Sequence, residues 1–307
     1  MITYYFRTVK DSELKTLSEV RTGIWVHAVE PTEAELETLV TQFGLDTTVV
    51  EDAQDFFEVP RLEREGSVSY FFTRYPYNEQ REDTDTAPLL IVLGESFVLT
   101  IAQREVPQFK RFIDGTTPVV TTQKTKLFIT FMEALTQSFE RQLVSLRKSV
   151  HRDRAQLRRI GNREIVRFVG YEHKLNDFVA AVVPTNTALK QLTKGSYIQL
   201  FADDVELMED LMIDNNQLVD SARSVLNTIQ NVRGAAEAIL TNNLNTTIRT
   251  LTLLTVLLTI PMVVASFYGM NVTLPLQDNP AAFWIIVSTV LGIVGGAGWF
   301  FKRSQWF

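Results

Sequence analysis

The sequence contains no cysteine and only three histidines among its 307 residues. The missing thiols exclude disulfides, cysteine nucleophiles and cysteine-ligated zinc or iron–sulfur centres. The histidines, His27, His151 and His173, are too far apart along the chain to form a local metal-binding pair. Any bound metal is therefore expected to meet oxygen ligands, which suit hard cations.

Motifs of common catalytic and nucleotide sites are also missing. No Gly-x-x-x-x-Gly-Lys-Ser/Thr phosphate loop occurs, and residues 94–98 read Gly-Glu-Ser-Phe-Val, without the final glycine of a hydrolase nucleophile elbow. The formal net charge is −6, so no overall basic field attracts nucleic acid. We expect neither an enzyme nor a nucleic-acid partner.

The C-terminal part is strongly hydrophobic. Charged residues are absent between Arg249 and Asp278, and a second uncharged run, 281–301, ends directly before Lys302. Each run is long enough to cross ~30 Å of hydrocarbon as a helix. A buried hairpin of a soluble protein is the alternative, but aromatic residues flank both runs, as they do at membrane interfaces. We predict membrane spans at about 248–268 and 281–301, joined by an external loop at about 271–280.

The distribution of basic residues predicts the orientation. The loop carries no Lys or Arg, whereas Arg249, Lys302 and Arg303 lie at the opposite ends of the spans. Cytoplasmic segments are enriched in Lys and Arg, so both termini are expected in the cytoplasm. The N-terminus lacks the pattern of a secretory signal. The prediction is a multi-pass protein in the lipid bilayer of the plasma or inner membrane.

The pattern of apolar residues divides the expected cytoplasmic part into two regions. Residues 1–123 alternate short apolar runs with turn signals and are predicted to form an α/β domain, with strands at 2–9, 24–29, 68–75, 88–93 and 97–102 and a helix at 31–43. Residues 124–247 have helical periodicity and are predicted to form a helical stalk. Residues 248–307 form the transmembrane domain.

Three long helices are expected near 124–160, 163–193 and 202–270, with Gly161, Pro184 and Gly195 as breaks. In the third, Leu211, Leu218, Val225 and Val232 recur every seven residues and predict a coiled-coil-like seam. The expected fold class is an N-terminal α/β cytoplasmic domain, long stalk helices and two C-terminal transmembrane helices.

Charge is segregated along these helices. The basic residues are Arg147, Lys148, Arg152, Arg154, Arg158, Arg159, Arg163 and Arg167, and the acidic residues are Asp203, Asp204, Glu206, Glu209, Asp210 and Asp214. Both sets are explained by solvated faces with ion pairs between helices or subunits. Alternatively, the acidic cluster binds a hard divalent cation. A third interpretation places the basic run against anionic lipid or nucleic acid.

The first span ends in Tyr268-Gly269-Met270-Asn271 and is followed by a short loop and one further span. With Pro261 and the long helix upstream, this arrangement resembles the CorA-type magnesium transporter family, whose hallmark is Gly-Met-Asn at this position. The resemblance implies a homopentameric, funnel-like channel with Gly269, Met270 and Asn271 as its selectivity filter. An amide oxygen holds a cation less tightly than a carboxylate does, and Mg²⁺ gives up its water reluctantly. An ordinary helix C-cap is the alternative for these residues.

The first span carries a stripe that fits a pore. Asn245, Thr252, Thr259 and Ser266 recur every seven residues, with Ile248, Thr255 and Met262 between them. Several copies facing one axis would enclose a channel, with Ile248, Leu251 and Met262 as apolar constrictions. Against this, threonines in a span often only bond back to their own helix.

The second span contains Gly292 and Gly296 in a Gly-x-x-x-Gly spacing. Such small residues allow close helix approach in lipid. We expect them to pack against the first span.

The resemblance also implies regulation by intracellular Mg²⁺ through carboxylates between subunits. Alignment back from Asn271 places the stalk carboxylate at Asp210, or near it at Asp214, and Glu79 is the expected partner. Relatives commonly carry a glutamate after the proline of the outer loop, where this chain has Leu276. Asp278 is the candidate to replace it.

The predicted function is Mg²⁺ uptake driven by the membrane potential, with Mg²⁺ as both transported and regulatory ion. A charge gains ~2.3 kcal/mol per 100 mV, so a divalent ion gains about twice that. One alternative is a Zn²⁺, Co²⁺ or Ni²⁺ transporter of the same superfamily. Another is a membrane-anchored sensor that transports nothing.

Overall fold

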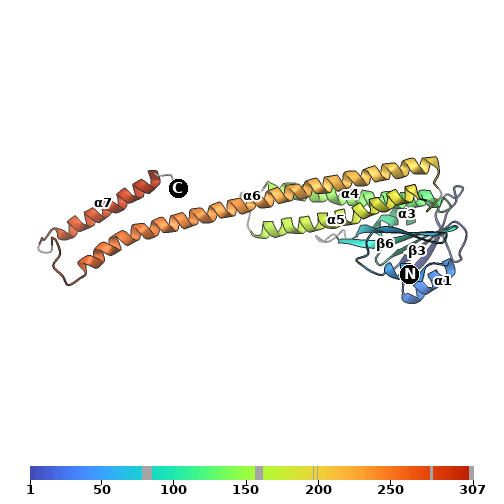
Figure 1. The fold of residues 1–307 in the computed structure, drawn as a ribbon, viewed down its shortest axis with the longest axis horizontal. Coiled ribbons are helices and arrows are strands. Elements are labelled where there is room, and N and C mark those ends of the chain that lie inside the picture. The colour runs from blue at the N-terminus through green and yellow to red at the C-terminus, as the bar shows by residue number, and fades with distance from the viewer. Residues whose placement is uncertain (78–84, 156–161, 196, 199, 277–278, 304–307) are drawn as a thin grey trace. The chain divides into compact units, whose positions relative to one another are not determined.

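The computed structural model describes residues 1–77, 85–155, 162–195, 197–198, 200–276 and 279–303 (Figure 1). The chain divides into two compact units, Met1–Val232 and Arg233–Phe307. The boundary falls within one long helix, α6 (Ala202–Tyr268). The domain boundaries at residues 123 and 247 were predicted from the pattern of apolar residues, and they stay predictions.

A seven-stranded sheet forms the centre of the first unit. Its strands are β1 (Ile2–Phe6), β2 (Lys15–Leu17), β3 (Ile24–Val29), β4 (Arg61–Glu65), β5 (Val68–Tyr77), β6 (Asp85–Leu93) and β7 (Phe97–Ala102). Their order is β2-β1-β3-β7-β6-β5-β4. Of the strand pairs in this sheet, β3 and β7 run parallel and the other five are antiparallel. The predicted strands are present, but the short β2 and the charged β4 were missed.

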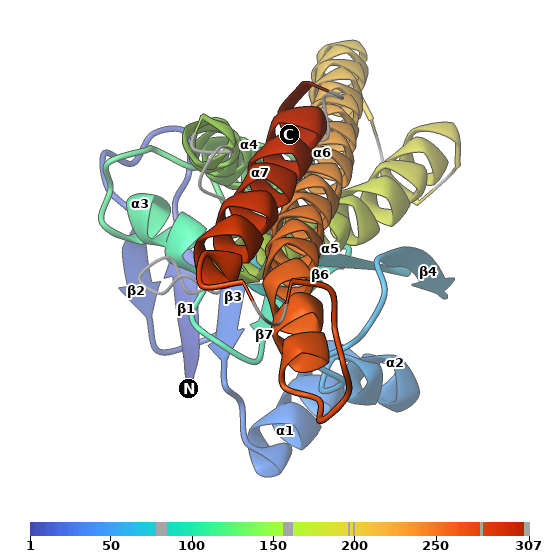
Figure 2. The same ribbon diagram turned by 90° about the vertical axis from the view of Figure 1, so that its left-hand side faces the viewer.

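Helices cover both faces of this sheet. Alternate residues of β3 point to opposite faces, so that Trp25 joins one hydrophobic core and Val26 the other. Figure 2 shows α1 (Glu33–Phe43) and α2 (Thr47–Asp52) on one side and α4 (Lys124–Arg154) and α5 (Asn162–Lys194) on the other. Thr32 and Glu35 form a capping box at the start of α1, and Gly44 ends it with φ 61°.

Aromatic rings fill the core between the sheet and α4. The Phe131 ring lies 4.5 Å from the Phe109 ring and 4.8 Å from the Trp25 ring, measured between centroids. Phe112 lies 5.6 Å from Phe131. Phe109 and Phe112 belong to the short turn η1 (Pro107–Phe109) and helix α3 (Lys110–Ile113), which fasten the sheet to α4. All four rings are fully buried.

Three long helices complete the first unit, and the third of them continues into the second. They are α4 (Lys124–Arg154), α5 (Asn162–Lys194) and α6 (Ala202–Tyr268). Pro184 lies inside α5 and does not break it, so that part of the prediction is wrong. The seven-residue repeat Leu211, Leu218, Val225 and Val232 is buried within this single chain. The seam therefore packs α6 against the chain's own helices.

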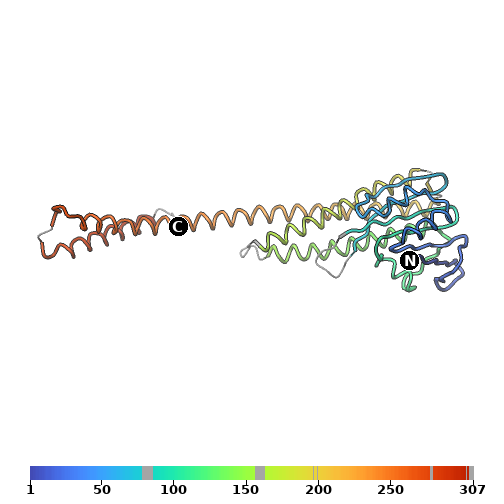
Figure 3. The backbone as a smooth tube through the Cα atoms, turned by 90° about the horizontal axis from the view of Figure 1, so that it is seen from below, coloured from blue at the N-terminus to red at the C-terminus, as the bar shows by residue number. Residues whose placement is uncertain are grey.

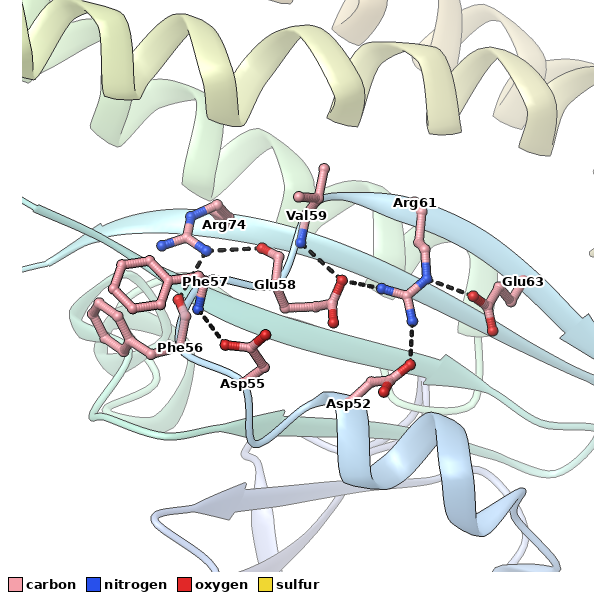
Figure 4. Close-up of polar contacts among 9 residues, drawn as sticks. All are labelled: Asp52, Asp55, Phe56, Phe57, Glu58, Val59, Arg61, Glu63 and Arg74. Carbon is pink, nitrogen blue, oxygen red and sulfur yellow. Dashed lines mark hydrogen bonds and ion pairs between the residues drawn. The ribbon is translucent and has the colours of Figure 1, made fainter.

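Two arginines fix the loop between α2 and β4 (Figure 4). Arg61 pairs with Glu58, with Asp52 at 2.6 Å and with Glu63 at 2.5 Å. Arg74 donates to the backbone oxygens of Phe56 at 3.0 Å and Glu58 at 2.8 Å. Since loop carbonyls have no strand partners, the Arg74 guanidinium satisfies two of them, while Arg61 neutralises the carboxylates around the loop.

His27 is buried within the aromatic core. Its Nδ1 lies 2.8 Å from Thr100 Oγ1, which also accepts a hydrogen bond from Trp25 Nε1 at 3.0 Å. Its ring lies 5.5 Å from the Phe109 ring. Burial lowers the pKa of His27 to about 4 from the ordinary 6.5.

We expect acid to destabilise the first unit through His27. Between pH 6.5 and about 4 the unfolded histidine binds a proton that the folded one does not, so stability falls as pH falls through this window. The loss is about 3 kcal/mol at pH 4. Denaturant unfolding in detergent at a series of pH values measures it. His27→Gln should flatten the profile in this window, and an unchanged slope would contradict the assignment.

The second unit contains the end of α6 and helix α7 (Ala282–Arg303). Helices α6 and α7 each contain a stretch long and apolar enough to cross a membrane. Within the described part of the chain, none of either stretch is buried. Their exposure separates them from the core helices of a soluble protein, which would be covered.

Candidate ion pathway

The motif Gly269-Met270-Asn271 lies at the end of α6. Gly269 N donates to the backbone oxygens of Ala265 at 3.0 Å and Ser266 at 3.3 Å, which closes the last helical turn. Tyr268 Oη donates to Pro275 O at 3.1 Å and so ties the loop to the helix. The side chain of Asn271 is exposed and forms no hydrogen bond within the described part of the chain. Its amide oxygen is thus available to an ion or to the water around one.

The polar stripe lies on the side of α6 that α7 leaves uncovered. Asn245, Thr252, Thr255, Thr259 and Ser266 are all exposed in the single chain. A different side of α6 is partly covered. Its residues include Leu253, Leu257, Ile260 and Val264. At ~100° per residue these two sets fall on roughly opposite sides of the helix. On α7 the partly covered residues also share one side of the helix, and the two helices shield each other through these faces. They are Ala282, Ile286, Val287, Val290, Val294, Ala297, Gly298 and Phe301.

The threonine hydroxyls of the stripe bond back to the helix. Thr252 donates to Ile248 O at 2.9 Å, Thr255 to Leu251 O at 2.9 Å and Thr259 to Thr255 O at 2.7 Å. Thr246 and Thr250, which are outside the stripe, do the same, so the bond does not mark a pore. With its hydrogen engaged, however, each hydroxyl oxygen presents only lone pairs outward.

The three apolar candidates for constrictions are exposed as well. Ile248 is 52% exposed, Leu251 62% and Met262 73%. Large apolar side chains beside a polar stripe are unusual unless other helices cover them. Either lipid or further copies of the chain must do so.

The candidate regulatory carboxylates lie on the outside of α6. Asp210 and Asp214 are exposed and one turn apart. The sequence interpretation missed Glu133 of α4, which is half-buried and close enough to Asp214 for the two charges to repel. Burial raises the pKa of Glu133, Asp214 raises it further and Arg111 opposes both. The helical spacing of α4 gave no signal that Glu133 would face α6.

Two predicted site residues, Glu79 and Asp278, lie outside the described residues. Among the residues that the structure does describe, no group of three or more His, Asp or Glu side chains is placed to hold a metal ion. A single chain thus brings Asp214 near one carboxylate, Glu133, and does not assemble a closed metal site in its described ranges.

Gly292 and Gly296 do not contact α6 of the same chain. A Cβ atom added to either glycine would meet no atom of the described chain within 4 Å. The expected packing against a first span is therefore absent within one chain, and packing against α6 of another copy stays a prediction.

Comparison with known proteins identifies the family. The sequence profile of the family described as "CorA-like Mg2+ transporter protein" matches residues 21–303. The "Cobalt/magnesium transport protein CorA" of Methanocaldococcus jannaschii is 26% identical over 294 residues, which cover 92% of this chain and 91% of the relative. The "Magnesium transport protein CorA" of Pasteurella multocida is 20% identical over 307 residues, 95% of this chain and 94% of the relative.

The fold agrees with this match. The complete structure of the CorA magnesium transporter from Methanocaldococcus jannaschii superposes with a TM-score of 0.88 at 21% identity, covering 100% of this chain and 99% of the other. The predicted fold class, an α/β domain, a long helix and two C-terminal apolar helices, is confirmed. The expectation that the chain is no enzyme is confirmed by the family, which consists of transporters. From Arg21 to Arg303, the chain belongs to the CorA-like Mg²⁺ transporter family.

Proposed function

We propose that the chain forms a homopentameric channel that conducts Mg²⁺ into the cell along the membrane potential. The observation that carries this proposal is the polar stripe of α6, on the side opposite to the face that α7 shields. One helix cannot enclose water, but a ring of identical helices turning this stripe to a common axis does so. A simple membrane anchor has no use for such a stripe.

In this channel Asn271 presents a ring of amide oxygens at the outer mouth, within the segment Gly269-Met270-Asn271. The ion keeps most of its water there, because Mg²⁺ loses its hydration shell reluctantly. Ile248, Leu251 and Met262 narrow the pore, and the oxygens of Thr252, Thr255 and Thr259 accept hydrogen bonds from the water around the ion. Asn245 and Ser266 line the two ends of the stripe.

The proposed topology places the loop 271–280 outside and both termini in the cytoplasm of the plasma or inner membrane. Arg249, Lys302 and Arg303 then lie on the cytoplasmic side, as the distribution of basic residues favours. Asp278 contributes negative charge near the outer mouth.

Ion flux into proteoliposomes tests the transport function. At an inside-negative potential of about 100 mV, Mg²⁺ gains ~4.6 kcal/mol and should accumulate more than a thousandfold at equilibrium. A luminal Mg²⁺ dye measures uptake, and collapsing the potential with an ionophore should abolish the accumulation. The same assay with Co²⁺, Ni²⁺ and Zn²⁺ defines the ion, since a hydrated ion need not meet soft ligands. If no divalent ion crosses the membrane in this assay, the channel proposal fails and the membrane-anchored sensor remains.

Intracellular Mg²⁺ closes this channel through Asp210, with Asp214 and Glu79 as further candidate ligands between subunits. Bound Mg²⁺ offsets the repulsion between these carboxylates and holds the closed arrangement together. Asp210→Ala should raise the internal Mg²⁺ concentration needed for closure by on the order of tenfold. Flux at graded luminal Mg²⁺ measures this shift. Asp220→Ala is the matched control, because Asp220 is an exposed α6 carboxylate near Arg223, and an equal response of both variants would place sensing elsewhere.

A further inference from the structure

One end of the α4–α5 hairpin is strongly basic. Six exposed side chains form this basic end: Arg147, Lys148, Arg152, Arg154, Arg163 and Arg167. Arg158 and Arg159 lie outside the described residues and are not counted among the six. The chain as a whole has a net charge of −6, so this end of the hairpin is locally positive on a chain that is negative overall.

Contacts between the two helices bring the six residues together. Tyr171 Oη of α5 donates to Asp153 Oδ2 of α4 at 3.0 Å, and Arg167 Nη1 lies 3.4 Å from the same oxygen. The last turns of α4 are therefore beside the first turns of α5. Asp153 itself is buried, so its negative charge is directed inward while the cations remain in solvent.

Among the described residues, most of these cations have no acidic partner. Arg167 pairs with Asp153 and Glu164, and Arg152 donates to Ser149 Oγ. Within the described ranges, Arg147, Lys148, Arg154 and Arg163 form no ion pair. The predicted ion pairs between neighbouring helices thus account for only part of the basic end.

The acidic start of α6 cannot neutralise the basic end from a neighbouring copy. Thr136 Oγ1 of α4 donates to Asn215 Oδ1 of α6 at 2.9 Å, which places Asp210 level with the first half of α4. Figure 3 shows these helices side by side in the first unit. Arg152 is then about 30 Å farther along the helix direction at ~1.5 Å per residue. Copies related by an axis along the helices hold equal residues at equal heights, so the acidic and basic sets do not meet.

We propose that the basic end binds the anionic phospholipid headgroups of the cytoplasmic leaflet. By the register of Thr136 and Asn215, Arg152 is level with α6 near Val232. Helix α6 itself runs on to Tyr268 and contains the stretch that is long and apolar enough to cross a membrane. Clusters of Lys and Arg near a membrane attract anionic lipid over about one Debye length. The membrane-spanning stretches of the same chain hold the lipid surface at a high effective concentration near the basic end. Nucleic acid has no such link to the chain.

Energy transfer to the bilayer tests this inference, which rests on the proposed membrane topology. Because the chain has no cysteine, Ala155→Cys, at the exposed C-cap of α4, accepts one donor dye. The intact protein is placed in phosphatidylcholine vesicles with or without phosphatidylglycerol, with an acceptor dye on a minor lipid headgroup. We expect greater transfer in the anionic vesicles, and loss of the difference at high salt.

A charge variant and its control decide the outcome. Replacement of Arg147, Lys148, Arg152 and Arg154 by Gln should lower the ratio of membrane-bound to free hairpin ends by on the order of tenfold or more. The control replaces Lys10, Lys110, Lys190 and Lys194 by Gln, which removes equal charge from exposed positions elsewhere, and should retain the transfer.

Three results would overturn the inference. They are transfer that does not depend on lipid charge, equal transfer by the two variants, and binding of a short RNA duplex by the unaltered basic end in preference to the anionic vesicles. Mg²⁺ uptake in the same vesicles separates the two hypotheses: if uptake persists without a lipid effect, only the lipid contact fails, whereas absence of uptake counts against the channel.

Discussion

Replacing Asn271 by alanine should reduce Mg²⁺ uptake to the level of protein-free vesicles. Asn271 is exposed at the end of α6, and in the proposed pentamer every subunit loses its amide oxygen at once. A hydrated Mg²⁺ ion then finds no protein acceptor at the mouth, and entry becomes unfavourable. Potential-driven uptake into proteoliposomes measures the effect, and size-exclusion chromatography in detergent checks that the oligomer remains.

Asn243→Ala provides the matched control for this experiment. Asn243 is also an exposed asparagine of α6, but at ~100° per residue it falls on the other side of the helix from the stripe. We expect near-normal uptake from this variant. Undiminished uptake by Asn271→Ala, with its oligomer intact, would remove Asn271 from the filter. Asn271→Asp tests the chemistry further: a carboxylate ring should bind the ion more tightly and release it more slowly.

Phe131→Ala should lower the free energy of unfolding of the first unit by about 3–5 kcal/mol. Phe131 is 0% exposed and its ring contacts Trp25, Phe109 and Phe112. Its removal leaves a cavity where the sheet meets α4, because the aromatic neighbours cannot all close in. Denaturant unfolding of the detergent-solubilised protein, followed by near-ultraviolet circular dichroism, measures the loss.

Phe57→Ala is the control for the core substitution. Phe57 belongs to the same unit and has the same side chain, but it is 80% exposed in the loop that Arg61 and Arg74 fix. Its replacement should change the free energy of unfolding by less than about 0.5 kcal/mol. Similar losses from both variants would mean that the aromatic cluster does not dominate the stability of this unit.

Much of this architecture could be predicted because its signals are local. The uncharged runs that end α6 and form α7 are visible in composition alone, and the apolar β3 and β7 follow from their residues. The short β2 and the charged β4 were missed because each becomes a strand only through its neighbour in the sheet. Pairing across a sheet is a long-range property that a local pattern does not contain.

The site shows the same division. The stripe from Asn245 to Ser266 follows helical spacing and could be predicted from the sequence. The approach of Glu133 to Asp214 depends on how α4 and α6 are aligned along each other, which spacing within one helix does not specify. The motif of Gly292 and Gly296 predicted a helix contact but not which chain supplies it, and within the described chain α6 does not.

Pro261 has a mechanical consequence for the span. Proline has no backbone N–H, so the helical bond that would join position 261 to the carbonyl of Leu257 cannot form, although α6 continues through it. Between Asp210 and Thr259 the backbone hydrogen bonds of the helix are uninterrupted, so a rotation near Asp210 is transmitted to Thr259. Met262 and Asn271 lie beyond the missing hydrogen bond. In the proposed topology, the outer third of the span is thereby a hinged segment, able to tilt while the inner portion keeps its orientation.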